Sequence, residues 1–145
     1  MVRSRSAGSE DGFTLVELLV VILIIGILAA VAMGAFLAQR GKAQDADAKA
    51  SVSTAAKAME TWYTDRGGYD GATPAELAQI EPSLGRARGL DVQSTPTTYT
   101  VSVDSAGDGG TFSVERKATG DILRDCTRPG LGTCRDQPDA QGNRW

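Results

Sequence analysis

The run of 21 residues from Leu18 to Ala38 constrains this chain most, because it contains no charged side chain. A helix rises about 1.5 Å per residue, so the run would be roughly 31 Å long, close to the thickness of the hydrocarbon layer of a bilayer. We therefore predict a membrane-spanning helix within residues 13–38.

Glu17 directly precedes this run and places a carboxylate at the membrane boundary. Ionisable groups at such positions are expensive and generally have a function and a partner. One explanation is local, because Thr14 and Glu17 have the spacing of a capping box, in which two side chains satisfy free amides at a helix start. The other is a functional role with a partner, and the residues alone leave both open.

The charge and composition of the chain exclude several classes of function. Its 15 Lys and Arg against 18 Asp and Glu give a formal net charge of −3, so no large electropositive surface is available and DNA is not expected as an obligate partner. The chain has no histidine, the commonest general base and a frequent zinc ligand. Without a nucleophile–base pair or a metal-ligand cluster, we expect neither an enzyme nor a cofactor.

The apolar run divides the chain into a leader, a span and a head. Residues 1–12 are polar and include Arg3 and Arg5, which favour a leader that stays cytoplasmic by the positive-inside tendency. Residues 39–145 would then form one small extracytoplasmic head. A cleaved secretory signal is the alternative, because Ala30-Val31-Ala32 resembles a cleavage site, although the run exceeds the usual signal core of about 7–15 residues.

Two helical patterns follow the start of the span. Gly26, Ala30 and Gly34 fall four apart on one face, which permits close approach between helices in lipid, while each glycine weakens the helix by about 1 kcal/mol. We therefore predict helix packing or flexibility at these three positions. Beyond the span, residues 39–64 are expected to continue the helix up to Gly67-Gly68, with an apolar stripe that must pack on the head: Ala48, Val52, Ala55, Met59 and Trp62.

The rest of the head has the pattern of a short helix followed by strands. In residues 65–96, Thr73 and Pro74 with Glu76 predict a capped helix that ends near Ile80. In residues 97–124, apolar residues alternate with polar ones on both sides of a Gly-rich turn at 106–110, which predicts a β-hairpin. Further strands are expected near residues 90–93 and 122–123, giving an α+β fold with a small antiparallel sheet that covers the stripe.

Cys126 and Cys134 lie in the last segment, residues 125–145, which is rich in Gly, Pro, Asp and Arg and is expected to be irregular. If the head faces an oxidising compartment, a disulfide here would add about 2–3 kcal/mol of stability. Two free thiols are the alternative. A metal site would need at least two more ligands, which no histidine or further cysteine can supply.

One stretch combines these features in a specific order, Gly12-Phe13-Thr14-Leu15-Val16-Glu17-Leu18-Leu19-Val20-Val21, with Gly26-Ile27-Leu28-Ala29-Ala30 after it. It resembles the processing and assembly segment of a type IV prepilin. The resemblance implies a type IV pilin-like fold: a long N-terminal helix packed on a small antiparallel sheet, with a C-terminal loop closed by a disulfide. Many pilins have a proline where this chain has Gly34.

The resemblance also implies a function. A membrane prepilin peptidase would cleave between Gly12 and Phe13, Phe13 would be N-methylated, and the mature chain would polymerise into a filament through its apolar helix. Glu17 would neutralise the α-amino group of Phe13 on a neighbouring subunit, because either charge alone is costly in an apolar bundle. The implied partners are other pilin subunits, the peptidase, the pilus assembly platform and the inner membrane. The chain would pass from the cytoplasmic membrane, head outside, to an extracellular filament.

Two alternatives of similar build stay open. A pseudopilin of type II secretion usually has a calcium-stabilised loop, which Asp104, Asp108 and Asp121 would mimic, although surface turns also explain these residues. A minor pilin would instead bind DNA or a surface ligand at the filament tip. Its candidate cations are Arg86, Arg88, Arg116, Lys117, Arg124 and Arg128.

Overall fold

The computed structural model describes residues 12–145. Of the predicted leader, only Gly12 falls within this range, and residues 1–11 lie outside the described residues. The chain divides into two compact units, one that ends at Phe36 and one that runs from Leu37 to Trp145. We refer to the second unit as the head.

The helix α1 spans Leu15–Arg66. Its sequence contains no proline, and the alanine-rich stretch after Gln39 has high helix propensity, so nothing interrupts the backbone hydrogen bonds. Gly67 ends the helix with a φ of 77°, a left-handed conformation that favours glycine, and its N–H donates to the carbonyl of Tyr63 at 2.7 Å. The prediction of a long helix that glycines terminate is confirmed.

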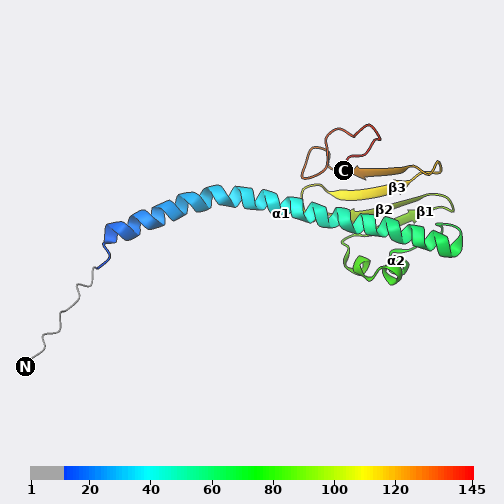
Figure 1. Cartoon of the computed structure of the whole chain (residues 1–145), viewed down its shortest axis with the longest axis horizontal. Coiled ribbons are helices and arrows are strands. Elements are labelled where there is room, and N and C mark those ends of the chain that lie inside the picture. Colours follow the sequence, from blue (N-terminus) through cyan, green and yellow to red (C-terminus); the bar gives the residue numbers. More distant parts are fainter. Residues whose placement is uncertain (1–11) are drawn as a thin grey trace, which may run out of the picture. The chain divides into compact units, whose positions relative to one another are not determined.

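Four antiparallel strands form one sheet in the order β1-β2-β3-β4 (Figure 1). Their bounds are β1 Asp91–Ser94, β2 Tyr99–Asp104, β3 Thr111–Arg116 and β4 Ile122–Cys126. The predicted hairpin is the β2–β3 pair, in which Val101 faces Val114 and Val103 faces Phe112. The two weaker strand predictions are confirmed as β1 and β4, and β4 extends to Cys126, into the segment that was expected to be irregular.

The apolar stripe of α1 packs on one face of this sheet. All five stripe residues are buried, and so are the alternate apolar residues of β2 and β3. On the other flank of α1, Leu77 and Leu84 complete the core from the helix α2, Pro74–Ile80, and the 3-10 helix η1, Pro82–Arg86. Helix α2 begins as predicted, because the Glu76 N–H donates to the Thr73 hydroxyl at 3.3 Å.

Candidate functional site

The start of α1 forms a reciprocal cap. The Glu17 N–H donates to Thr14 Oγ1 at 3.2 Å, while the Thr14 N–H and hydroxyl donate to Glu17 Oε2 at 3.4 and 3.3 Å. This is the capping-box geometry that the sequence predicted. Phe13, immediately before the cap, is 78% exposed, and among residues 12–145 the carboxylate of Glu17 hydrogen-bonds only with Thr14 at its own helix end.

The first part of α1 leaves its apolar side chains uncovered. Every large apolar residue from Leu15 to Leu37 is exposed, and the most apolar window of the helix has a mean hydropathy of 3.1. A helix that is apolar on all sides must be buried in lipid or against other helices. By length and composition α1 is able to cross a membrane.

A shallow apolar groove runs along one face of this segment. It is lined by the small residues Gly26 and Ala30 and by the larger side chains of Leu19, Ile22, Leu23 and Ile27. A Cβ atom added at Gly26 or Gly34 would meet nothing within 4 Å, so contacts within this chain do not require glycine at either position. The role of these glycines in helix packing or flexibility stays a prediction.

The head closes its C-terminal segment with a disulfide between Cys126 and Cys134, whose Cα atoms lie 5.9 Å apart. The bridge joins the end of β4 to the loop that follows, and the predicted pairing is confirmed. Inside the bridge, Gly130 N–H donates to the Cys134 carbonyl at 3.0 Å and Leu131 N–H to the Arg128 carbonyl at 3.1 Å. We call residues 126–134 the disulfide loop.

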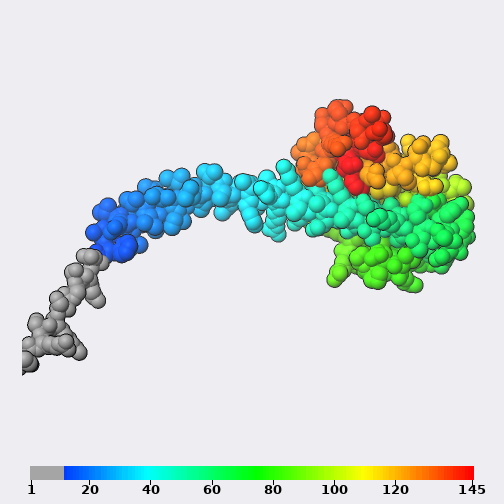
Figure 2. All heavy atoms as spheres, viewed as in Figure 1, coloured from blue at the N-terminus to red at the C-terminus, as the bar shows by residue number. Residues whose placement is uncertain are grey.

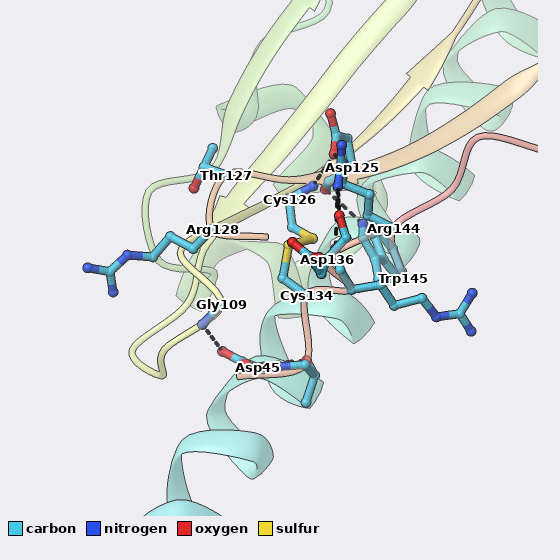
Figure 3. Close-up of a disulfide and its surroundings, with 12 residues drawn as sticks. Asp45, Gly109, Asp125, Cys126, Thr127, Arg128, Cys134, Asp136, Arg144 and Trp145 are labelled. Carbon is cyan, nitrogen blue, oxygen red and sulfur yellow. Dashed lines mark hydrogen bonds and ion pairs between the residues drawn. A yellow bond between two sulfur atoms is a disulfide. The ribbon is translucent and has the colours of Figure 1, made fainter. Parts of the chain in front are cut away.

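Asp45 holds this loop to α1, and the sequence analysis did not identify it. Within residues 12–145 it is the one charged residue that is fully buried. Its Oδ1 accepts from the Ser105 hydroxyl at 2.6 Å and the Gly109 N–H at 3.1 Å, and its Oδ2 accepts from the N–H and hydroxyl of Thr133 at 2.8 and 3.2 Å. One carboxylate thus ties the β2–β3 turn and the disulfide loop to the helix (Figure 3).

Glycines surround Asp45 because little space remains there. A Cβ atom at Gly107, Gly109 or Gly132 would collide with the Asp45 carboxylate, and Gly132 also has a φ of 57°. Burial raises the pKa of Asp45, but the hydrogen bonds from Ser105, Thr133 and Gly109 outweigh it and hold that pKa below the ordinary value of 3.8. Asp45 therefore stays ionised in the folded head at neutral pH.

Lys49, one helical turn after Asp45, strengthens the same attachment. Its Nζ donates to the Thr133 carbonyl at 3.0 Å and lies 5.1 Å from the ring centre of Phe112 and 5.9 Å from that of Trp145. Burial lowers the pKa of Lys49, while the Asp45 carboxylate raises it. The Trp145 indole donates to the Asp125 carbonyl at 2.8 Å, so the C-terminal segment is packed rather than loose.

The depressed pKa of Asp45 predicts an acid-sensitive head. A carboxylate whose pKa is lower in the folded than in the unfolded state adds stability above its unfolded pKa and loses it as pH falls through the folded pKa. We expect the melting temperature of the head to decrease as the pH falls below about 4, and to decrease less steeply in Asp45→Asn, in which the lowered pKa of Asp139 still contributes. Thermal unfolding at several pH values measures it, and identical pH dependence in the two proteins would contradict the assignment.

The candidate cations do not form one patch. Arg116 and Arg124 line a groove between α1 and strands β3 and β4, whereas Arg86 and Arg88 line another with Asp47 and Asp104. Asp104 ends strand β2 and accepts from the Thr111 hydroxyl at the start of β3, whereas Asp121 lies between β3 and β4 and accepts from the Thr119 hydroxyl. In the described part of the chain, no group of three or more His, Cys, Asp or Glu side chains is placed to hold a metal.

The chain matches one family model over a short N-terminal segment and several known proteins over most of its own length. Residues 9–33 match the family model of the prokaryotic N-terminal methylation motif. The chain is 39% identical over 98 residues to the type IV wide pilus major component PilA4 of Thermus thermophilus, covering 68% of this chain and 66% of PilA4. It is 34% identical over 107 residues to the narrow pilus major component PilA5 of the same organism, covering 72% and 86%.

A third relative is more distant. The type IV major pilin protein PilE1 of Neisseria gonorrhoeae is 32% identical over 109 residues, which cover 74% of this chain and 50% of PilE1. The chain thus spans between half and two thirds of the length of PilE1 and PilA4.

Proposed function

The chain belongs to the type IV pilin family, and from this premise we propose that it is a structural subunit of a type IV pilus. The observation that carries the proposal is the uncovered apolar part of α1, which requires lipid before assembly and other helices afterwards. We propose that the chain is first anchored in the cytoplasmic membrane, with residues 1–12 inside and the head outside.

Processing would convert the anchored chain into a subunit. We propose that a prepilin peptidase cleaves after Gly12, that Phe13 is then N-methylated, and that an assembly platform adds the chain to the filament. Gly12 and Phe13 are both exposed before the first turn of α1, which supports access by a protease. Their position beside the Thr14–Glu17 cap leaves the helix start intact after cleavage.

Mass spectrometry of filaments sheared from cells that express the full chain tests this function. The expected subunit begins at Phe13, with a methyl group on its α-amino nitrogen, and its mass includes the closed disulfide. A strain that lacks the peptidase serves as the control and should retain the full chain in its membrane. Subunits that begin at Met1, or filaments without this chain, would refute the proposal.

Gly26 provides a prediction about helix packing. Because nothing in the chain lies within 4 Å of a Cβ at Gly26, Gly26→Leu should insert and fold normally. In the filament, however, the added side chain would keep neighbouring helices apart, and we expect about tenfold fewer filaments. Ala35→Leu is the matched control, because nine residues at about 100° each place it on the opposite face. Quantitative immunoblots of sheared filaments make the comparison, and equal losses would argue against a Gly26 contact.

A further inference from the structure

A groove in the head runs between α1 and strands β3 and β4. Its volume is about 350 Å³, within the range of small binding sites. The apolar side chains that line it are Ala56, Tyr99, Val114 and Ile122. On α1 it extends from Ser53 to Glu60, roughly 10 Å along the helix axis, which fits one or two side chains of a partner. We call it the α1–β4 groove.

The lining of this groove has a positive net charge, because it contains three cationic side chains and one carboxylate, and that carboxylate is already engaged. Glu60 accepts from the hydroxyls of Tyr69 and Tyr99 at 2.9 and 3.1 Å and pairs with Arg116 at 3.3 Å. Burial and Glu60 raise the pKa of Tyr69 to about 12, so its hydroxyl remains a donor. Lys57 and Arg124 line the groove too, and no carboxylate of residues 12–145 lies within 4.0 Å of either cation.

The disulfide loop presents an apolar side chain that the head does not use. Leu131 is 52% exposed, although the disulfide and the contact of Thr133 with Asp45 fix the loop around it. Asp136 is also exposed and lies beside this loop, because a Cβ at Gly130 would contact its side chain at 3.7 Å. We call Leu131 and Asp136 together the loop knob, and the C-terminal segment that carries it forms a lobe on the head (Figure 2).

We propose that the loop knob of one subunit docks into the α1–β4 groove of a second copy of this chain. Leu131 would cover the apolar floor, and the Asp136 carboxylate would lie between the ammonium of Lys57 and the guanidinium of Arg124. The inference rests on the proposed function and identifies a contact between heads. Because knob and groove are different surfaces of one molecule, the contact is heterologous and repeats from copy to copy instead of closing a dimer.

Photo-crosslinking in filaments tests the contact directly. With p-benzoylphenylalanine in place of Leu131, ultraviolet light should give a ladder of covalent multimers, and mass spectrometry should place the links on residues 53–60 or 114–124 of another copy. The same probe in place of Tyr63, which is also exposed, should give no link to the groove of another copy. Filaments that give no ladder, or links elsewhere on the head or to another protein, overturn the contact.

Charge reversal provides an independent test. Asp136→Lys alone, and Lys57→Glu with Arg124→Glu, should each reduce filament yield about tenfold, because like charges would face each other. All three substitutions together should restore the yield to within about threefold. Asp91→Lys, on the opposite edge of the sheet, is the matched control. Unchanged yields for the separate reversals, or no recovery in the triple variant, overturn the contact and leave the pilus function standing. Wild-type filaments without this chain would instead refute that function and the contact with it.

Discussion

Replacing Asp45 with alanine is expected to lower the free energy of unfolding of the head by about 3–5 kcal/mol. The variant would leave the Ser105 hydroxyl and the amides of Gly109 and Thr133 without their acceptor in a place that water reaches poorly. It would also leave the Lys49 ammonium without its neighbouring negative charge.

Two further variants separate charge from general disturbance of the helix. Asp45→Asn keeps one acceptor oxygen but turns an NH₂ group toward a donor. Its free energy of unfolding should therefore lie between that of the wild type and that of Asp45→Ala. Asp47→Ala, exposed on the same helix, should change stability by less than about 0.5 kcal/mol. Tryptophan fluorescence during denaturant unfolding measures all three, because Trp62 and Trp145 both belong to the head. A loss below about 1 kcal/mol for Asp45→Ala would contradict the proposed tie.

Periodicity and capping carried most of the fold prediction. The stripe on α1, the cap at Thr73 and the alternation in β2 and β3 are local patterns, and each determines an element within a few residues. The sheet then follows because the stripe needs an apolar face of matching size. Likewise, the Thr14–Glu17 cap was predictable because both partners lie within one helical turn.

The Asp45 contacts were not predictable in the same way. Its partners lie 60 to 88 residues away in turns whose paths depend on the completed fold. One signal was present, however: Asp45, Ala48 and Val52 are spaced three and four apart, so Asp45 continues the buried face of the helix. A charged residue in register with a buried stripe indicates a buried carboxylate that needs several donors.

The disulfide and irregular path of the C-terminal segment were predicted, but its detailed contacts were not, for a different reason. It has no period, and its structure depends on single contacts, such as the Trp145 indole on the Asp125 carbonyl and the Arg144 N–H on the Arg124 carbonyl at 2.9 Å. Such contacts give no pattern in the sequence. The loop knob could therefore be identified only from the structure.

The second large effect is expected at Glu17. Two roles of this residue have to be separated: the cap that it forms with Thr14 and the proposed pairing with the α-amino group of Phe13 on a neighbouring subunit. Glu17→Ala should insert into the membrane and fold its head normally, because Glu17 is exposed and, among residues 12–145, its side chain hydrogen-bonds only with Thr14. In the filament it would leave the α-amino cation of a neighbouring Phe13 unpaired among apolar helices. Breaking such a buried pair costs about 3–5 kcal/mol, so we expect filament yield to fall about a hundredfold or more.

Glu17→Gln distinguishes the charge of Glu17 from its cap. Glutamine fits a capping box as glutamate does, so this variant keeps the hydrogen bonds with Thr14 and removes only the negative charge. If Glu17 pairs with an amino group, Glu17→Gln should fail to assemble, while Thr14→Ala, which weakens the cap and keeps the carboxylate, should still form filaments. Immunoblots of sheared filaments and of membranes distinguish assembly from expression. The reverse pattern would mean that the helix start needs its cap and that no cation on a neighbour needs Glu17.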